Sequence, residues 1–119
     1  MSRSWFFGVL LVLAVTLPML SCNSSNNMYN TPSANTVTIY DNYFSPSSLT
    51  VPVGTTVTWQ MQGTSHSATS GIPPTPSGVF DSGIMSQGQA YQYTFTQPGT
   101  YAYFCRIHQA AMEGSIMVQ

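Results

Sequence analysis

Residues 90–105, AYQYTFTQPGTYAYFC, form two runs in which aromatic residues alternate with smaller or polar ones. In each run every second side chain would share one face: Tyr91, Tyr93 and Phe95 in the first, Tyr101, Tyr103 and Cys105 in the second. A period of two is typical of a strand that buries one face. The Pro98–Gly99 pair between the runs favours a turn. The segment therefore predicts two β-strands joined by a turn.

Similar alternation recurs after residue 35, and no convincing helical pattern interrupts it. The other expected strands are residues 36–40, 48–53, 56–62 and 114–119. Pro52 favours a sheet edge for residues 48–53, because proline cannot donate a ladder hydrogen bond. Residues 71–78, GIPPTPSG, contain three prolines and are expected to form an ordered or semi-rigid loop. Short strands separated by turns predict an all-β, antiparallel sandwich or barrel.

Two short features add detail to this all-β prediction. Val57, Trp59 and Met61 share one face of the strand expected at residues 56–62. The PGTY motif at residues 98–101 resembles a tyrosine corner, in which a tyrosine near the start of a late strand bonds back to the backbone. Tyr101 is the residue expected to make that bond.

The first 21 residues indicate an export signal, because an arginine precedes an apolar run that ends in small residues. The run contains Pro18 and is shorter than the ~20 residues of a membrane-spanning helix. The motif MLSC at residues 19–22 resembles the lipobox of bacterial lipoproteins, so Cys22 is expected to carry lipid as the mature N-terminus. An ordinary signal peptide that happens to contain a cysteine is the alternative. Residues 22–35 are polar and are expected to be a flexible tether.

These boundaries predict one folded domain at residues 36–119 in an exported, membrane-anchored lipoprotein that faces the periplasm or the cell exterior. The whole chain has only two basic and three acidic residues. There is no basic patch, which excludes nucleic-acid binding. Once Cys22 is lipidated, Cys105 is the only remaining cysteine, so no intramolecular disulfide can form. The domain is expected to be a monomer.

Residues 104–112, FCRIHQAAM, place Cys105 at the end of a strand and His108 and Met112 on the loop that follows. His66, the other histidine, comes after residues 56–62, where a sandwich could bring it alongside. A thiolate, two imidazoles and a thioether form a donor set that favours copper. Zinc usually takes a fourth strong ligand or a water. A Cys–His nucleophile would lack an obvious orienting Asn or Asp, and a C-x-x-C-H haem motif is absent. A buried structural cysteine is the simplest alternative.

Five motifs in order resemble a small type 1 (blue) copper protein of the cupredoxin family, of the plastocyanin and amicyanin type. They are YFSPSSLTVPVGTTVTW at 43–59, SHS at 65–67, FDSG at 80–83, YTFTQPGTYAYFC at 93–105 and HQAAMEGSIMV at 108–118. The resemblance covers residues 36–119 and implies a Greek-key β-sandwich. It also implies that one copper ion is held by four ligands: His66, Cys105, His108 and Met112.

The chain departs from the family pattern at two positions beside these residues. Three residues separate His108 from Met112, where family members commonly have two or four. Ser67 stands where plastocyanins place asparagine. In the family this position helps to tie the two ligand loops together, so Ser67 is expected to support the ligands.

Such a site has no obvious open coordination position, which favours one-electron transfer between Cu(I) and Cu(II) and argues against an enzyme. The resemblance implies that His108 is the electron port, reached through an apolar patch that includes Ile107, Ala110 and Ala111. Residues 72–74 would extend this patch if their loop lies at the same end. The expected partners are a redox donor and a redox acceptor. Copper storage or delivery is the alternative function, although such proteins tend to have extra Met or His clusters and the tether has only Met28.

Overall fold

The computed structural model describes residues 33–119. The regular secondary structure in this range consists of strands alone: β1 (Thr36–Tyr40), β2 (Tyr43–Ser45), β3 (Ser48–Val51), β4 (Thr56–Met61), β5 (Ser65–His66), β6 (Thr69–Ile72), β7 (Thr75–Asp81), β8 (Met85–Ser86), β9 (Ala90–Thr94), β10 (Gly99–Cys105) and β11 (Gln109–Val118). None of the elements between residues 33 and 119 is a helix that could span a lipid bilayer. The expected signal peptide, Cys22 and most of the tether lie outside the described residues.

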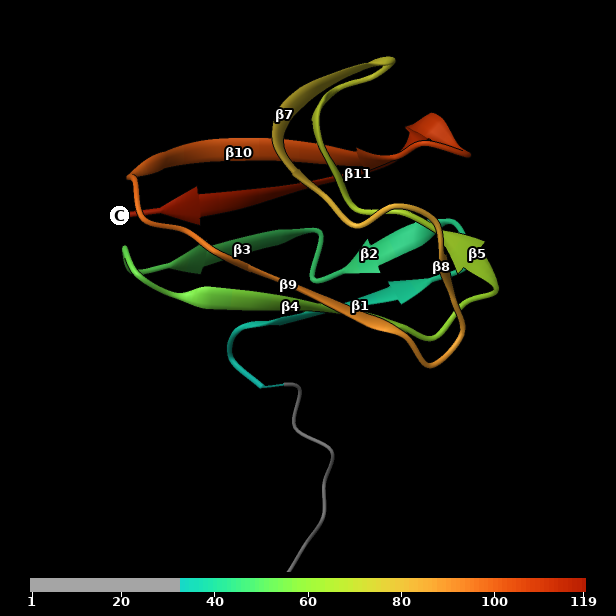
Figure 1. Ribbon diagram of the computed structural model, residues 1–119, viewed down its shortest axis with the longest axis horizontal. Coiled ribbons are helices and arrows are strands. Elements are labelled where there is room, and N and C mark those ends of the chain that lie inside the picture. Colours follow the sequence, from blue (N-terminus) through green and yellow to red (C-terminus); the bar gives the residue numbers. More distant parts are fainter. Residues whose placement is uncertain (1–32) are drawn as a thin grey trace, which may run out of the picture.

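Two larger sheets form the sandwich, in the orders β2-β1-β4-β9 and β3-β11-β10-β6-β7, and β5 pairs with β8 in a third, two-stranded sheet (Figure 1). The expected all-β sandwich is therefore confirmed. Two strand pairs are parallel, β1 with β4 and β3 with β11. Alternation of buried and exposed residues shows that one face of a strand is buried. The pattern is the same whether the neighbouring strand is parallel or antiparallel. The mixture of directions was therefore not predicted.

The segments that contain Pro52 and Pro76 both lie at sheet edges. β3 is an edge strand and Pro52 follows its last residue, as expected. The prediction of a loop at residues 71–78 is wrong, because β6 and β7 form a hairpin with Ile72 opposite Thr75. β7 is the other edge of the same sheet. Proline is excluded from central strands only, so an edge strand can accommodate Pro76.

The core lies between the two larger sheets and is centred on Trp59. Val57, Trp59 and Met61 are all fully buried, which confirms the face expected for β4. The Trp59 ring centroid lies 5.0 Å from that of Phe80 and 5.6 Å from that of Tyr103, both on the opposite sheet. Aromatic packing across the sandwich therefore fixes the position of β10, the strand that ends at Cys105.

Tyr101 makes the backbone bond that its motif predicted. Its hydroxyl donates to the carbonyl oxygen of Gln97 at 2.8 Å. The tyrosine corner thereby links the start of β10 to the chain that precedes it.

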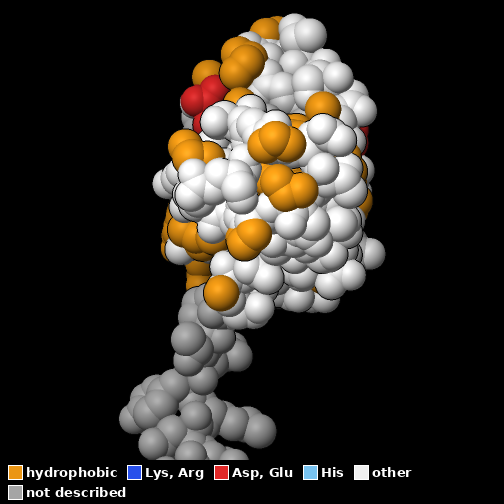
Figure 2. All heavy atoms as spheres, turned by 90° about the vertical axis from the view of Figure 1, so that its left-hand side faces the viewer, with side chains coloured by type: hydrophobic (Ala, Val, Ile, Leu, Met, Phe, Trp, Pro, Cys, Tyr) orange, Lys and Arg blue, Asp and Glu red, His pale blue; other side chains and the backbone are white. Residues whose placement is uncertain are grey.

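The ends of the sandwich differ. In Figure 1, β10 runs from the end that carries the C-terminus toward the end where β5 and β8 lie. Figure 2 looks onto the C-terminal end, where most of the surface is backbone or side chains that are neither hydrophobic nor charged, with scattered hydrophobic side chains and little acidic surface. The residues with metal-binding side chains gather at the other end.

Candidate metal centre

Cys105 and His108 are placed by the connection between β10 and β11. Cys105 is the last residue of β10, and a three-residue turn containing His108 follows. The pairing register then shifts, because Cys105 pairs with Gln109 whereas Phe104 pairs with Glu113. Residues 110–112 therefore bulge from β11. Met112 lies in this bulge of the strand and not on the loop expected from the sequence, because the chain pairs with β10 again directly after the turn.

Three donor atoms from two distant segments meet at this end of the sandwich. The Cys105 Sγ lies 3.7 Å from His66 Nδ1 and 3.7 Å from His108 Nδ1. The three potential ligand atoms all lie within 4.8 Å of one another. The two imidazole rings are tilted by 33° with centroids 4.9 Å apart. This arrangement can hold a single metal ion.

The burial of these side chains is graded. Cys105 is fully buried and His66 is 2% exposed, whereas His108 is half-buried. Met112 is also buried and belongs to the same core cluster as Cys105. Its role as a metal ligand stays a prediction. The burial leaves His108 as the histidine of the centre that is most open to solvent.

A ring of hydrogen bonds connects the residue after His66 to the residue after Cys105. The Arg106 backbone N–H donates to Ser67 Oγ at 3.0 Å. Ser67 Oγ bonds to Thr69 Oγ1, which donates to an oxygen of Asp81. The Arg106 guanidinium forms an ion pair with the other oxygen of Asp81 and closes the ring. The structure thus shows Ser67 joining the two segments, while sequence reasoning missed Thr69, Asp81 and Arg106.

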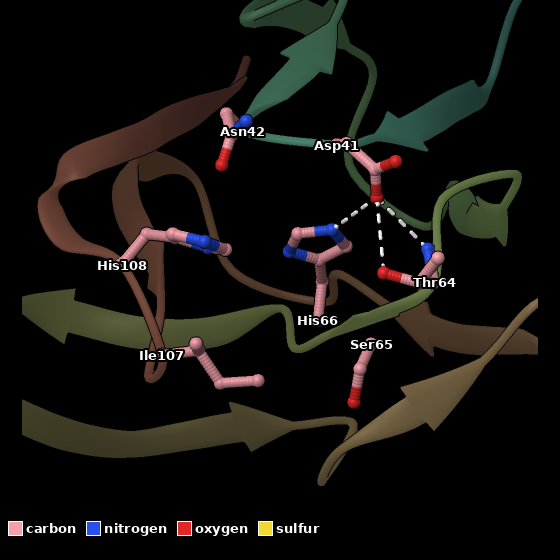
Figure 3. A pocket seen from close by; sticks show the side chains of 7 residues that line it. All are labelled: Asp41, Asn42, Thr64, Ser65, His66, Ile107 and His108. Carbon is pink, nitrogen blue, oxygen red and sulfur yellow. Dashed lines mark hydrogen bonds and ion pairs between the residues drawn. The ribbon is translucent and has the colours of Figure 1, made fainter.

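Sequence reasoning also missed the contact between Asp41 and His66. The Asp41 Oδ1 lies 2.9 Å from His66 Nε2 and also accepts bonds from the Thr64 N–H and hydroxyl (Figure 3). The hydrogen bond to His66, followed by that from the Thr64 backbone, holds the pKa of Asp41 below its usual value. The side chain is 58% exposed. It is therefore an ionised carboxylate at neutral pH, held against a buried imidazole.

An open pocket of about 440 Å³ lies in front of both histidines (Figure 3). Ile107, which is 50% exposed, lines its rim. The expected contribution from residues 72–74 is not found there: Ile72 lines a different pocket, with residues 100–102 at the beginning of β10. Antiparallel pairing of β6 with β10 carries the hairpin tip away from Cys105.

The protein-family model for copper-binding proteins of the plastocyanin/azurin family matches residues 32–119 of the sequence. The chain belongs to this family. It is 38% identical over 84 residues to a plastocyanin of Scenedesmus fuscus, which covers 64% of this chain and 86% of the plastocyanin.

Solved structures give the same result for the cupredoxin fold. A purple cupredoxin of Nitrosopumilus maritimus superimposes with a TM-score of 0.64 at 26% identity, over 71% of this chain and 98% of the other. An oxidised amicyanin variant gives 0.63 at 31% identity, over 72% and 82%. A copper-containing nitrite reductase of Thermus scotoductus gives 0.60 at 33% identity, over 71% of this chain but only 22% of the enzyme. The fold thus also occurs as part of an enzyme.

Copper is the cofactor of this cupredoxin. Two imidazole nitrogens and one thiolate sulfur, brought within 4.8 Å of one another, suit a copper ion. A type 1 copper site typically combines these three ligands with a weak axial sulfur, and the buried Met112 supplies a candidate. The residues present therefore fit one type 1 copper ion.

Replacing Ser67 with alanine should lower the free energy of unfolding by about 1–3 kcal/mol, because the Arg106 N–H would lose its buried acceptor. Urea unfolding of the metal-free protein measures this. Ser47→Ala is the control, since Ser47 is exposed and should change stability by less than about 0.5 kcal/mol. Equal unfolding midpoints for the two variants would show that the ring does not stabilise the fold.

Proposed function

We propose that this cupredoxin carries single electrons between two redox proteins outside the cytoplasm. The residues that would hold the ion are His66 through Nδ1, Cys105 through Sγ and His108 through Nδ1, with the Met112 sulfur as a weaker fourth donor. The observation that carries the proposal is the approach of the first three donor atoms to within 4.8 Å. A copper ion held by these residues would supply one-electron chemistry, because copper can be Cu(I) or Cu(II).

The protein contributes rigidity and exclusion of water. Cys105 is fully buried at the end of a central strand, and the hydrogen-bond ring holds the residue that follows it. His66 is buried and bonded to Asp41. Ligands fixed in this way need little rearrangement when the charge of the centre changes, which favours rapid electron transfer.

The surface beside His108 is the proposed docking site for both partners. His108 faces the open pocket, and Ile107, Ala110 and Ala111 are exposed close to it in the chain. A redox protein with a matching apolar patch could approach His108 closely. Because the chain has so few charged residues, electrostatic attraction should contribute little to this encounter.

Electron transfer with a partner should therefore depend only weakly on salt. The second-order rate should change by less than about threefold between about 0.01 and 1 M salt, although the Debye length falls from about 30 to 3 Å. Stopped-flow mixing measures the rate. Ile107→Glu should slow the reaction, whereas Val53→Glu should not, since Val53 is 47% exposed at the C-terminal end of the sandwich. A steep fall in rate with added salt contradicts weak steering.

Attachment to a membrane through lipid on Cys22 is also part of the proposal. Its support is the lipobox-like motif and the polar residues that follow it. The native chain should incorporate labelled palmitate in a bacterial host, and Cys22→Ser should not. Labelling of the serine variant to the same extent would exclude this anchor.

Electron transfer is favoured over copper storage and over catalysis by the number of ligands. In residues 33–119, the structure brings together one group of three His or Cys side chains. A storage protein or a catalytic copper centre would use further ligands. A redox titration distinguishes these functions: a carrier should take up and release one electron per copper reversibly while it retains the metal. Loss of copper on reduction would instead favour delivery.

A further inference from the structure

Asp41 occupies a position that aims its carboxylate at His66. It lies in the two-residue turn between β1 and β2, where Tyr40 pairs with Tyr43. Its Oδ1 accepts hydrogen bonds from the Thr64 N–H at 2.9 Å and from the Thr64 hydroxyl at 3.3 Å. These bonds orient the carboxylate independently of the imidazole. The third bond, to His66 Nε2 at 2.9 Å, then falls on an acceptor already in place.

Gly63 makes this close approach sterically feasible. A Cβ at position 63 would lie 2.5 Å from Asp41 Oδ1 and 2.9 Å from the Asp41 nitrogen. The Gly63 N–H donates to the carbonyl of Ile39, which holds the two segments together at this point. The absence of a side chain at Gly63 therefore provides the space that the carboxylate occupies.

The hydrogen bond determines which nitrogen of His66 faces the metal position. An ionised carboxylate can only accept, so Nε2 of His66 must carry the proton. Nδ1 then keeps its lone pair and faces Cys105 Sγ at 3.7 Å. Histidine ligands of metals are commonly oriented by a carboxylate on the other ring nitrogen, which also makes the imidazole a stronger donor.

We infer that Asp41 is a positioning residue of the metal centre, which fixes the His66 tautomer and favours Cu(II) over Cu(I). The inference rests on the proposed role of His66 as a ligand. A negative charge near the ligand stabilises the more positive ion, although exposure of the carboxylate to solvent weakens the direct Coulomb attraction. The contribution through the hydrogen bond does not require burial of the carboxylate.

Two variants separate the hydrogen bond from the charge. Asp41→Asn keeps an oxygen acceptor for His66 and Thr64 but removes the charge, whereas Asp41→Ala removes both. Glu113→Gln is the matched control, because it removes one exposed carboxylate that makes no hydrogen bond within residues 33–119. Each of the three changes removes one negative charge, so the three variants have the same net charge.

Nuclear magnetic resonance reports the tautomer directly. In the metal-free protein and in the diamagnetic Cu(I) protein, the His66 Nε2–H should exchange slowly with water in the unmutated chain, in Asp41→Asn and in Glu113→Gln. In Asp41→Ala it should exchange about tenfold faster or more, because a charge-assisted hydrogen bond is lost. The ¹⁵N shifts of His66 should assign the proton to Nε2.

The reduction potential reports the preference for Cu(II). Asp41→Ala should lower the ratio of Cu(II) affinity to Cu(I) affinity by about tenfold, which raises the potential by about 59 mV for a one-electron couple. Asp41→Asn should give a smaller rise, and Glu113→Gln should change the ratio by less than about twofold.

The inference is overturned if Asp41→Ala keeps the exchange rate of the unmutated chain, or if its potential equals that of Glu113→Gln. Failure of the unmutated protein to form a blue copper complex would overturn the proposed function instead. The resonances of the metal-free protein would still decide the tautomer, so the two failures can be told apart.

Discussion

Replacing Cys105 with serine should abolish the blue colour of the Cu(II)-loaded protein. The colour of a type 1 centre arises from charge transfer between a cysteine thiolate and Cu(II), and Cys105 is the free, fully buried cysteine of the described domain. A serine hydroxyl is a hard donor that stays protonated at neutral pH, so it cannot replace a soft thiolate. Losing a hydrogen-bond partner of a ligand typically lowers metal affinity by about 10–100-fold. Losing the thiolate itself should lower copper affinity by more than that.

Optical absorption of each variant after addition of one equivalent of Cu(II) measures this effect. Met85→Leu is a matched control, since Met85 is buried, pairs with His66 and is replaced by a residue of similar volume. It should keep the colour. Circular dichroism should show that both variants are folded. A blue Cys105→Ser protein would mean that the thiolate is not a ligand.

Replacing Trp59 with alanine should lower the free energy of unfolding by about 3–5 kcal/mol. Trp59 is fully buried on β4, and its ring lies 5.0 Å from Phe80 and 5.6 Å from Tyr103 on the other sheet. No small residue can fill the gap between the sheets. Since small domains are stable by only about 5–15 kcal/mol, this loss would bring the protein close to unfolding.

Urea unfolding of the metal-free protein measures the loss, with Trp59→Phe as the matched variant. Phenylalanine keeps most of the apolar contact. It also removes the indole N–H, which is buried without a hydrogen-bond partner in residues 33–119. The phenylalanine variant should therefore lose less stability than the alanine variant. Equal losses would show that contact across the sandwich does not depend on ring size.

The strands were predictable because their pattern is local. Alternating aromatic residues in β9 and β10, and the buried face of β4 around Trp59, follow from side chains that point to opposite faces. Pairing between distant strands has no such local signal. The parallel pairs and the β6–β7 hairpin, including Pro76 on its edge strand, depend on which strands meet and were missed.

The site was predictable in part for the same reason. Cys105 and His108 are three residues apart, so their association is local, whereas His66 was assigned through donor chemistry and family resemblance. Asp41 and Asp81 lie far from these residues in sequence, although Arg106, which pairs with Asp81, directly follows Cys105. The scarcity of charged residues was the only sequence signal for these contacts. The chain has few charged residues, and most of those in its described domain lie around this one site.

The electronic spectrum of the unmutated protein with one equivalent of Cu(II) decides whether the chain forms a type 1 copper centre. We expect an intense blue complex with one copper per chain, whose paramagnetic resonance is that of a type 1 centre and whose colour disappears reversibly on one-electron reduction. A colourless Cu(II) complex of the folded protein would contradict the claim that His66, Cys105 and His108 form an electron-transfer centre.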